Sequence, residues 1–377
     1  MKRLAQNSRT DFVLLAASLL LLLFGLLMIY NASPVTSLRD FGDPWHLVKQ
    51  QGFSALAALG AGVVGYRIHY KFWENISPLL IIGAIILLLM VFIPGLGVKV
   101  YGAQRWLNIG GFGIQPAELA KLAYIIYLSA WLSRKIKLAP FLIVTAILAG
   151  IVLLQRDFGT AAIIALTGGA IYFLSGAALW QFLFLVPAGL VSALVFILSS
   201  DYRRARFLTF LNPSLDTQGA AYHISQILIA LGSGGWWGVG LGQSRQKYGY
   251  IPEVTTDSIF AVIGNELGLI GSVLLVGVFV LIVLRGFKIA RQCKDRFGQL
   301  LAAGIASWLG LQAFINLAGM VALLPLTGVP LPFISFGGSS LVSVVFGVAL
   351  LLNIAKNNET SPMVNLQPAK RLQRRRR

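Results

Sequence analysis

The segment from Gly219 to Gly268 gathers acidic, basic and glycine residues in a chain that is otherwise mostly apolar. Within it, Asp257 stands directly before a long apolar run. A carboxylate without a partner is costly in such a place, so a functional role is the default hypothesis. On spacing alone, a helix N-cap is an equally good interpretation, because Thr255, Thr256 and Asp257 all precede the apolar helix. A threonine cap and an aspartate that faces a cavity are compatible.

Glu266 is the second acid of this segment. In a continuous helix its separation from Asp257 gives about 900° of rotation and about 13 Å of rise, so the two side chains would face opposite ways. That distance exceeds the roughly 5 Å between the paired carboxylates of retaining glycosidases. The pattern therefore favours a single general base, with a buried structural role for Glu266.

Glu118 and Lys121 form a second charged motif. They lie three positions apart, on one face of a predicted helix that starts at Pro116. Two hypotheses remain open at this stage. The residues neutralise each other so that the helix tolerates the membrane, or they line a polar cavity that they share with Asp257.

The composition is that of a membrane protein, with 57% hydrophobic and 12% charged residues in 377. Apolar runs of about 20 residues predict transmembrane helices. We expect an all-α integral membrane protein with ten of them. Their predicted ranges are 11–32, 48–65, 77–94, 116–132, 139–155, 159–175, 179–199, 257–284, 300–324 and 333–355.

An even number of spans puts both termini on one side of the membrane. The segments on that side hold about twice as many Lys and Arg residues as the opposite segments, which predicts cytoplasmic N- and C-termini. Residues 1–356 then form one polytopic domain. Its largest extracytoplasmic loop, about 200–256, lies between the seventh and eighth helices, and its aromatic residues place part of it along the membrane interface.

The net charge of +18 calls for an explanation. Part of it is the topology signal, and part is a disordered basic cytoplasmic tail, residues 357–377, that suits anionic lipids. A nucleic-acid partner is not expected, because no aromatic-rich soluble module accompanies the arginines. Several cations nevertheless fall outside the membrane, where arginine forks match phosphate oxygens of a diphosphate. They are Arg105, Arg156, Arg203, Arg204, Arg206, Arg245 and Lys247, and pairing with Asp157, Asp201 and Asp216 would explain about half of them.

Motifs along the chain, from the first span to about residue 355, resemble the SEDS family (shape, elongation, division and sporulation), which includes FtsW, RodA and SpoVE. The stretch from Pro325 to Leu341, PLTGVPLPFISFGGSSL, is highly specific for it. Gly240–Lys247 is more similar to the FtsW branch than to RodA. The other motifs are Gly102–Trp106, Gln115–Glu118 with Lys121, Asp157–Thr160, Tyr202–Arg204 through Asn212-Pro213, Ala221–His223 and Gly240–Gly268.

This resemblance implies a ten-helix peptidoglycan glycosyltransferase that polymerises lipid II outside the bacterial cytoplasmic (inner) membrane. The family's essential aspartate falls on Asp257, so the resemblance favours catalysis over the cap. The candidate substrate-binding residues are Arg105, Glu118, Lys121, Arg203, Arg245, Lys247 and Ser339. Several neighbours depart from the common pattern, which questions their roles and not the reaction class: Arg156, Gly249, Thr255, Ser258 and Asn265.

A mechanism follows as a hypothesis. Asp257 takes the proton from the 4-hydroxyl of the acceptor sugar, and the oxygen attacks the donor's anomeric carbon with inversion, displacing polyprenyl diphosphate. Cations stabilise the leaving charge. The sequence implies no resident cofactor and assigns no metal ligand, although Mg²⁺ or Mn²⁺ would serve the diphosphate.

Two other classes of function remain. A lipid II flippase could use Glu118 and Lys121 inside the membrane, and a membrane scaffold could recruit a transpeptidase. The family resemblance implies lipid II, a class B penicillin-binding protein transpeptidase and divisome or elongasome membrane proteins as partners.

Overall fold

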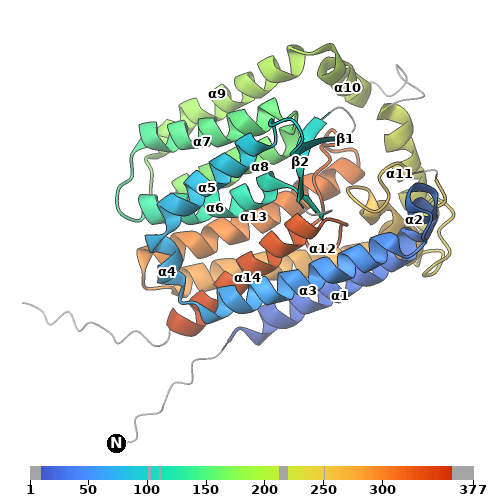
Figure 1. Cartoon of the computed structure of the whole chain (residues 1–377), viewed down its shortest axis with the longest axis horizontal. Helices are drawn as coiled ribbons and strands as arrows, with labels where there is room; N and C mark the ends of the chain where they lie inside the picture. The colour runs from blue at the N-terminus through green and yellow to red at the C-terminus, as the bar shows by residue number, and fades with distance from the viewer. Residues whose placement is uncertain (1–9, 101–102, 110–111, 212–219, 250, 359–377) are drawn as a thin grey trace, which may run out of the picture.

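The computed structural model describes residues 10–100, 103–109, 112–211, 220–249 and 251–358. Most of this length is α-helix, and the long helices form a bundle (Figure 1). The helices are α1 (Phe12–Ala32), α2 (Pro34–Phe41), α3 (His46–Arg67), α4 (Tyr70–Asn75), α5 (Ser77–Met90), α6 (Pro116–Leu132), α7 (Leu138–Leu154), α8 (Phe158–Leu174), α9 (Leu179–Leu198), α10 (Asp201–Leu211), α11 (Ala220–Gly234), α12 (Ile259–Gln292), α13 (Arg296–Met320) and α14 (Gly338–Asn358). Residues 359–377 of the predicted basic tail lie outside the described part.

Each of the ten apolar runs corresponds to a helix. The runs match α1, α3, α5, α6, α7, α8, α9, α12, α13 and α14. By length and apolar composition, five of the described helices could cross a membrane, and these are α1, α9, α12, α13 and α14. Three shorter apolar helices, α5, α7 and α8, accompany them. The chain therefore has the helices of a multi-pass membrane protein.

The expectation of an all-α fold is wrong at one place. Between α5 and α6 the chain forms a three-stranded antiparallel sheet of β1 (Gly97–Val100), β2 (Ala103–Ile109) and β3 (Phe112–Ile114) in the order β1-β2-β3. The physical reason is a short alternation in β2, where Ala103 and Leu107 are buried while Gln104 and Trp106 between them are only partly so. An antiparallel hairpin satisfies this pattern locally.

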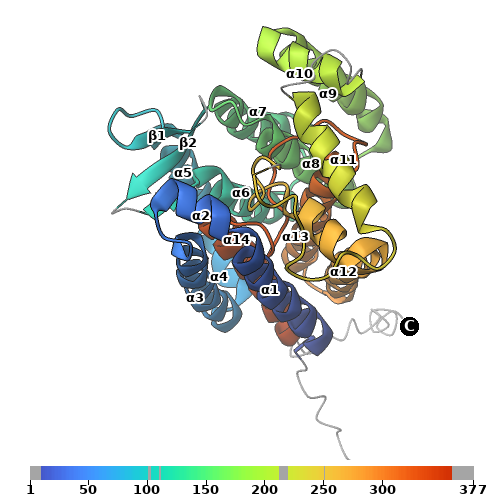
Figure 2. The same ribbon diagram turned by 90° about the vertical axis from the view of Figure 1, so that its right-hand side faces the viewer.

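The predicted large loop contains two further helices, α10 and α11. Helix α9, which precedes them, has no buried residue and lies at the edge of the bundle (Figure 2). Helix α11 packs against α12 and brings His223 to the beginning of that helix. The loop is therefore built around helical segments that pack on the bundle.

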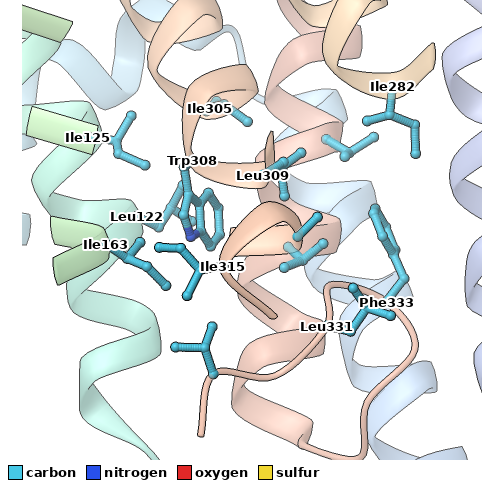
Figure 3. Packing of buried hydrophobic residues seen from close by; sticks show 14 of the residues in the cluster. Leu122, Ile125, Ile163, Ile282, Ile305, Trp308, Leu309, Ile315, Leu331 and Phe333 are labelled. Carbon is cyan, nitrogen blue, oxygen red and sulfur yellow. The ribbon is translucent and has the colours of Figure 1, made fainter. Parts of the chain in front are cut away.

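The core is centred on α13, which is buried along most of its length. Trp308 of α13 is fully buried and lies among Leu122 of α6, Ile163 of α8 and Leu309 of its own helix (Figure 3). Burial on every side explains why polar side chains on α13 must find partners inside the protein.

Helix α12 bends at Gly268, whose φ of 67° is outside the helical range. The backbone nitrogen of Gly238 lies so close that a Cβ at Gly268 would collide with it. Glycine is required here because the conformation is left-handed and leaves no room for a side chain. The bend lets the glycine-rich segment after α11 approach α12, where the nitrogen of Val239 donates to the carbonyl of Asn265 at 3.0 Å.

Candidate functional site

Asp257 lies in a turn two residues before α12 and is 8% exposed. The helix begins at Ile259, and its N-cap is Ser258. The interpretation of Asp257 as the cap is therefore wrong, and α12 begins two residues after the approximate start of the predicted span. The turn separates Asp257 from the helix that carries Glu266. The opposite-face argument for the two acids therefore rested on a continuous helix that the structure does not contain.

Hydroxyl groups flank the Asp257 carboxylate. Thr256 and Ser258 donate to its Oδ1 at 3.3 and 3.5 Å, the second being at the limit of a hydrogen bond. The Ser258 hydroxyl also lies 2.8 Å from Nε2 of His223 on α11. The sequence predicted no role for His223, and this contact places helix α11 beside the candidate catalytic acid.

The backbone of Asp257 is held by Asn316 of α13. The side-chain amide of Asn316 donates to the carbonyl oxygens of Asp257 at 2.9 Å and of Val329 at 2.8 Å. Val329 belongs to residues 321–337 between α13 and α14, called the 321–337 loop below. The nitrogen of Phe336 in this loop donates to the carbonyl of Thr255 at 2.8 Å. The turn that contains Asp257 is thus bound to the 321–337 loop directly, through Thr255 and Phe336, and indirectly, through Asn316. This loop holds the most specific family motif.

Glu118 and Lys121 form a fully buried ion pair on α6. Nζ of Lys121 donates to Glu118 at 2.7 Å and to Oε1 of Gln312 on α13 at 2.8 Å, and the side chains are 0% and 1% exposed. The indole nitrogen of Trp308 donates to the same Oε1 at 2.8 Å. The second oxygen of Glu118 has no partner among the described residues. The pair neutralises itself inside the bundle.

Gln312 and Asn316 connect this ion pair to Asp257. They lie four residues apart on α13, hence on one face. The amide nitrogen of Gln312 donates to the carbonyl of Pro330 at 3.0 Å, next to Val329, which Asn316 contacts. Sequence reasoning missed both residues. The available signal was a pair of amides at helical spacing in an apolar span.

Arg105 and Ser339 belong to a second network at the ends of helices. Arg105 of β2 donates to the carbonyl oxygen of Arg156. The neighbouring Asp157 caps α8 by accepting from Thr160 at 3.0 Å, and Gln115 donates to it at 3.3 Å.

The backbone nitrogen of Gln115 in turn donates to the hydroxyl of Ser339 at 2.9 Å. The sheet and the first residues of α6, α8 and α14 are therefore joined by one chain of hydrogen bonds. Arg156, one of its members, has a φ of 63°, which for an arginine is uncommon.

Lys247 is buried next to Glu266 and hydrogen-bonds to groups of the protein. Its Nζ lies 3.2 Å from Glu266, 2.6 Å from the side-chain oxygen of Asn31 and 2.8 Å from the carbonyl of Gly242. Asn31 of α1 also donates to Glu266. This network fits the structural role expected for Glu266. It also uses the three donors of Lys247 to hold the chain around Gly242 against α1 and α12.

Arg203 and Arg245 lie apart from these networks. Arg203 of α10 donates to the carbonyl of Phe196 and the hydroxyl of Ser199 at the end of α9, and stacks on the Phe196 ring. Arg245 is exposed in the segment before Asp257. In the described part of the chain, no group of three or more His, Cys, Asp or Glu side chains could hold a metal ion.

Comparison with known proteins is decisive about the family. Residues 11–360 match the family model FTSW_RODA_SPOVE, described as cell cycle protein. The chain belongs to the FtsW, RodA and SpoVE family. A probable peptidoglycan glycosyltransferase FtsW of Geobacter metallireducens is 39% identical over 95% of this chain and 98% of its own length. Stage V sporulation protein E of Bacillus subtilis is 38% identical over 93% and 97%.

A solved structure shares the fold. One chain of a peptidoglycan synthase complex, whose structure concerns the coordination of polymerization and crosslinking, matches with a TM-score of 0.77. It is 25% identical and covers 93% of this chain and 99% of its own. Family membership and the matching fold make this chain a multi-pass membrane protein.

Asn316→Leu tests the amide that holds Asp257. The change leaves two backbone carbonyls without their donor in a site that water does not reach, so we expect the free energy of unfolding to fall by about 1–3 kcal/mol. Thermal unfolding in detergent measures it. Asn75→Leu, at an exposed position of α4, is the matched control. Equal stability of the two variants would contradict the proposed bracing.

Lys121→Met tests the buried pair. It leaves Glu118 charged and alone, which costs about 3–5 kcal/mol, whereas Glu118→Gln together with Lys121→Met removes both charges and regains part of the loss. Lys71→Met is the control, because its ion pair with Asp295 is 3.9 Å long and Lys71 is 54% exposed, so it costs under about 1 kcal/mol. Similar losses for Lys121→Met and Lys71→Met would show that the pair is hydrated.

Proposed function

We propose that this protein is a peptidoglycan glycosyltransferase that polymerises lipid II at the outer face of the bacterial cytoplasmic membrane. Ten spans, with both termini in the cytoplasm, are the topology that the distribution of Lys and Arg supports. Family membership, and the glycosyltransferase names of relatives that match nearly the whole chain, support the activity.

The observation that carries the proposal is the placement of the Asp257 carboxylate. Its Oδ2 faces Gly328 of the 321–337 loop, where a Cβ would stand 3.8 Å away. Gly328 is exposed and has a φ of 70°, so a glycine is favoured there and no side chain fills the space. An acceptor hydroxyl that enters beside Gly328 would reach a carboxylate whose backbone is already fixed.

The proposed reaction uses this placement of the carboxylate. Asp257 removes the proton of the acceptor sugar's 4-hydroxyl while the oxygen forms a bond to the donor's anomeric carbon. The bond from that carbon to the diphosphate breaks, the configuration inverts, and the polyprenyl diphosphate carries away the electron pair. Arg105 and Arg245 remain the candidates to meet the diphosphate charge, because Lys121 and Lys247 are committed to carboxylates.

The flippase alternative loses its main support from the same contacts. Glu118 and Lys121 are closed against each other and against Gln312 within the core, where they do not supply the hydrated path that a head group needs. A transpeptidase of the class B penicillin-binding type is the proposed partner, since the related chain of known structure comes from a complex that polymerises and crosslinks.

Asp257→Asn tests the catalytic assignment. The amide cannot take a proton, so polymer formation from purified lipid II in liposomes is expected to fall about 10²–10⁴-fold, the usual contribution of a general base. Asp40→Asn, an exposed aspartate paired with Arg39 on α2, should polymerise as the unmodified protein does. Both variants are first compared by thermal unfolding.

Two results would overturn the proposal. One is full turnover by correctly folded Asp257→Asn protein. The other is transbilayer movement of labelled lipid II without any polymer, which would favour the flippase. Supplying lipid II only on the outer side of the liposomes separates the two activities, because a polymerase acting there needs no transport.

A further inference from the structure

A cavity of about 380 Å³ opens between α1, α3 and α14, at the end of the bundle where α1 begins. Its walls are almost entirely apolar and include Leu15 and Leu19 of α1, Val63 of α3 and Val348 of α14. Its lining takes in Thr10 and Tyr66 at one end, and Phe333 of the 321–337 loop. None of its lining residues takes part in the polar networks described above.

The cavity has the length of one membrane leaflet. Its lining runs along α1 from Thr10 to Leu22, which at about 1.5 Å per residue is about 18 Å. Half of a hydrocarbon core of about 30 Å is about 15 Å. We take the occupant to be a single flexible hydrocarbon chain, because such a chain can follow a narrow apolar groove of this length.

One end of the cavity is polar and positively charged. The hydroxyls of Thr10 and Tyr66 are hydrogen-bonded at 2.8 Å. Nζ of Lys356, in the last turn of α14, lies 4.9 Å from the centre of the Tyr66 ring. Within the described part of the chain no carboxylate lies within ion-pair distance of Lys356, and Arg67 beside Tyr66 is exposed. The nearby Asp11 is already paired with Arg285 at 2.8 Å.

We propose that this cavity binds one acyl chain of an anionic phospholipid, with the lipid phosphate at Lys356. The apolar walls accept the chain, the hydroxyl pair lies at the level of the glycerol, and the free ammonium meets the phosphate. The chain then lies against Phe333, whose backbone has a φ of 66° and whose carbonyl packs on Gly25 of α1. The bound lipid fills the space behind the 321–337 loop. This site does not depend on the proposed activity of Asp257.

Binding to delipidated, detergent-purified full-length protein tests the proposal, with native mass spectrometry or thermal shift as the readout. Dioleoyl phosphatidylglycerol is expected to bind about fivefold more tightly than dioleoyl phosphatidylcholine, because one lysine near the surface contributes about 1 kcal/mol. Glycerol phosphate without chains should not bind. Neither readout requires polymerisation, so a failure here leaves the catalytic assignment untouched.

Three variants sharpen the test. Lys356→Gln should remove the preference for phosphatidylglycerol, whereas Lys288→Gln, an exposed lysine of α12 outside the cavity lining, should keep it. Leu19→Trp should weaken both lipids about tenfold by filling the cavity. Equal losses for the two lysine variants, undiminished binding to Leu19→Trp protein, or tighter binding of undecaprenyl phosphate at the same site would each overturn the proposal.

Discussion

Backbone carbonyls buried in an apolar bundle need donors from the protein, and this requirement organises the structure around the 321–337 loop. Water does not reach the middle of a helix bundle in lipid, so irregular backbone survives there only with internal partners. Asn316 and Gln312 supply amide donors to Val329 and Pro330, and Gln51 of α3 accepts from the nitrogen of Gly337 at 3.2 Å. The loop is therefore as fixed as the helices around it.

The same requirement explains how charge is distributed. Glu118 meets Lys121, and Glu266 meets Lys247, each pair joining segments far apart in sequence through an amide of Gln312 or Asn31. A buried charge without a partner would cost several kcal/mol. These two ion pairs determine which segments contact each other, because a charge pair with additional amide contacts is fully hydrogen-bonded in one arrangement only. Each network thus places a loop relative to a helix.

The sequence predicted the structure best where a single property, such as a long apolar run, determines it. Apolar runs identified ten of the described helices but not α10 and α11 in the predicted loop, and Pro116 marked the first residue of α6. The sheet between α5 and α6 was not predicted, because its strands are too short for their residue pattern to be distinguished from that of a helix. The turn at Asp257 was not predicted, because Thr255, Thr256 and Asp257 are equally good capping residues in the sequence. In the structure the N-cap position is Ser258. The sequence shows that Gln312 and Asn316 are polar residues in an apolar span, but only the structure shows which backbone carbonyls they bind.

Among the described residues four carboxylates are buried, those of Glu118, Asp157, Asp257 and Glu266, and their surroundings differ. Glu118 and Glu266 each lie against a lysine ammonium, and Asp157 accepts from the first turn of α8. Asp257 has hydroxyl donors on one oxygen and an exposed glycine beside the other. A general base needs an accessible oxygen and a fixed position. Asn316 fixes the backbone of Asp257 from the core side, and Gly328 places no side chain next to Oδ2, which is why we propose Asp257 as the general base.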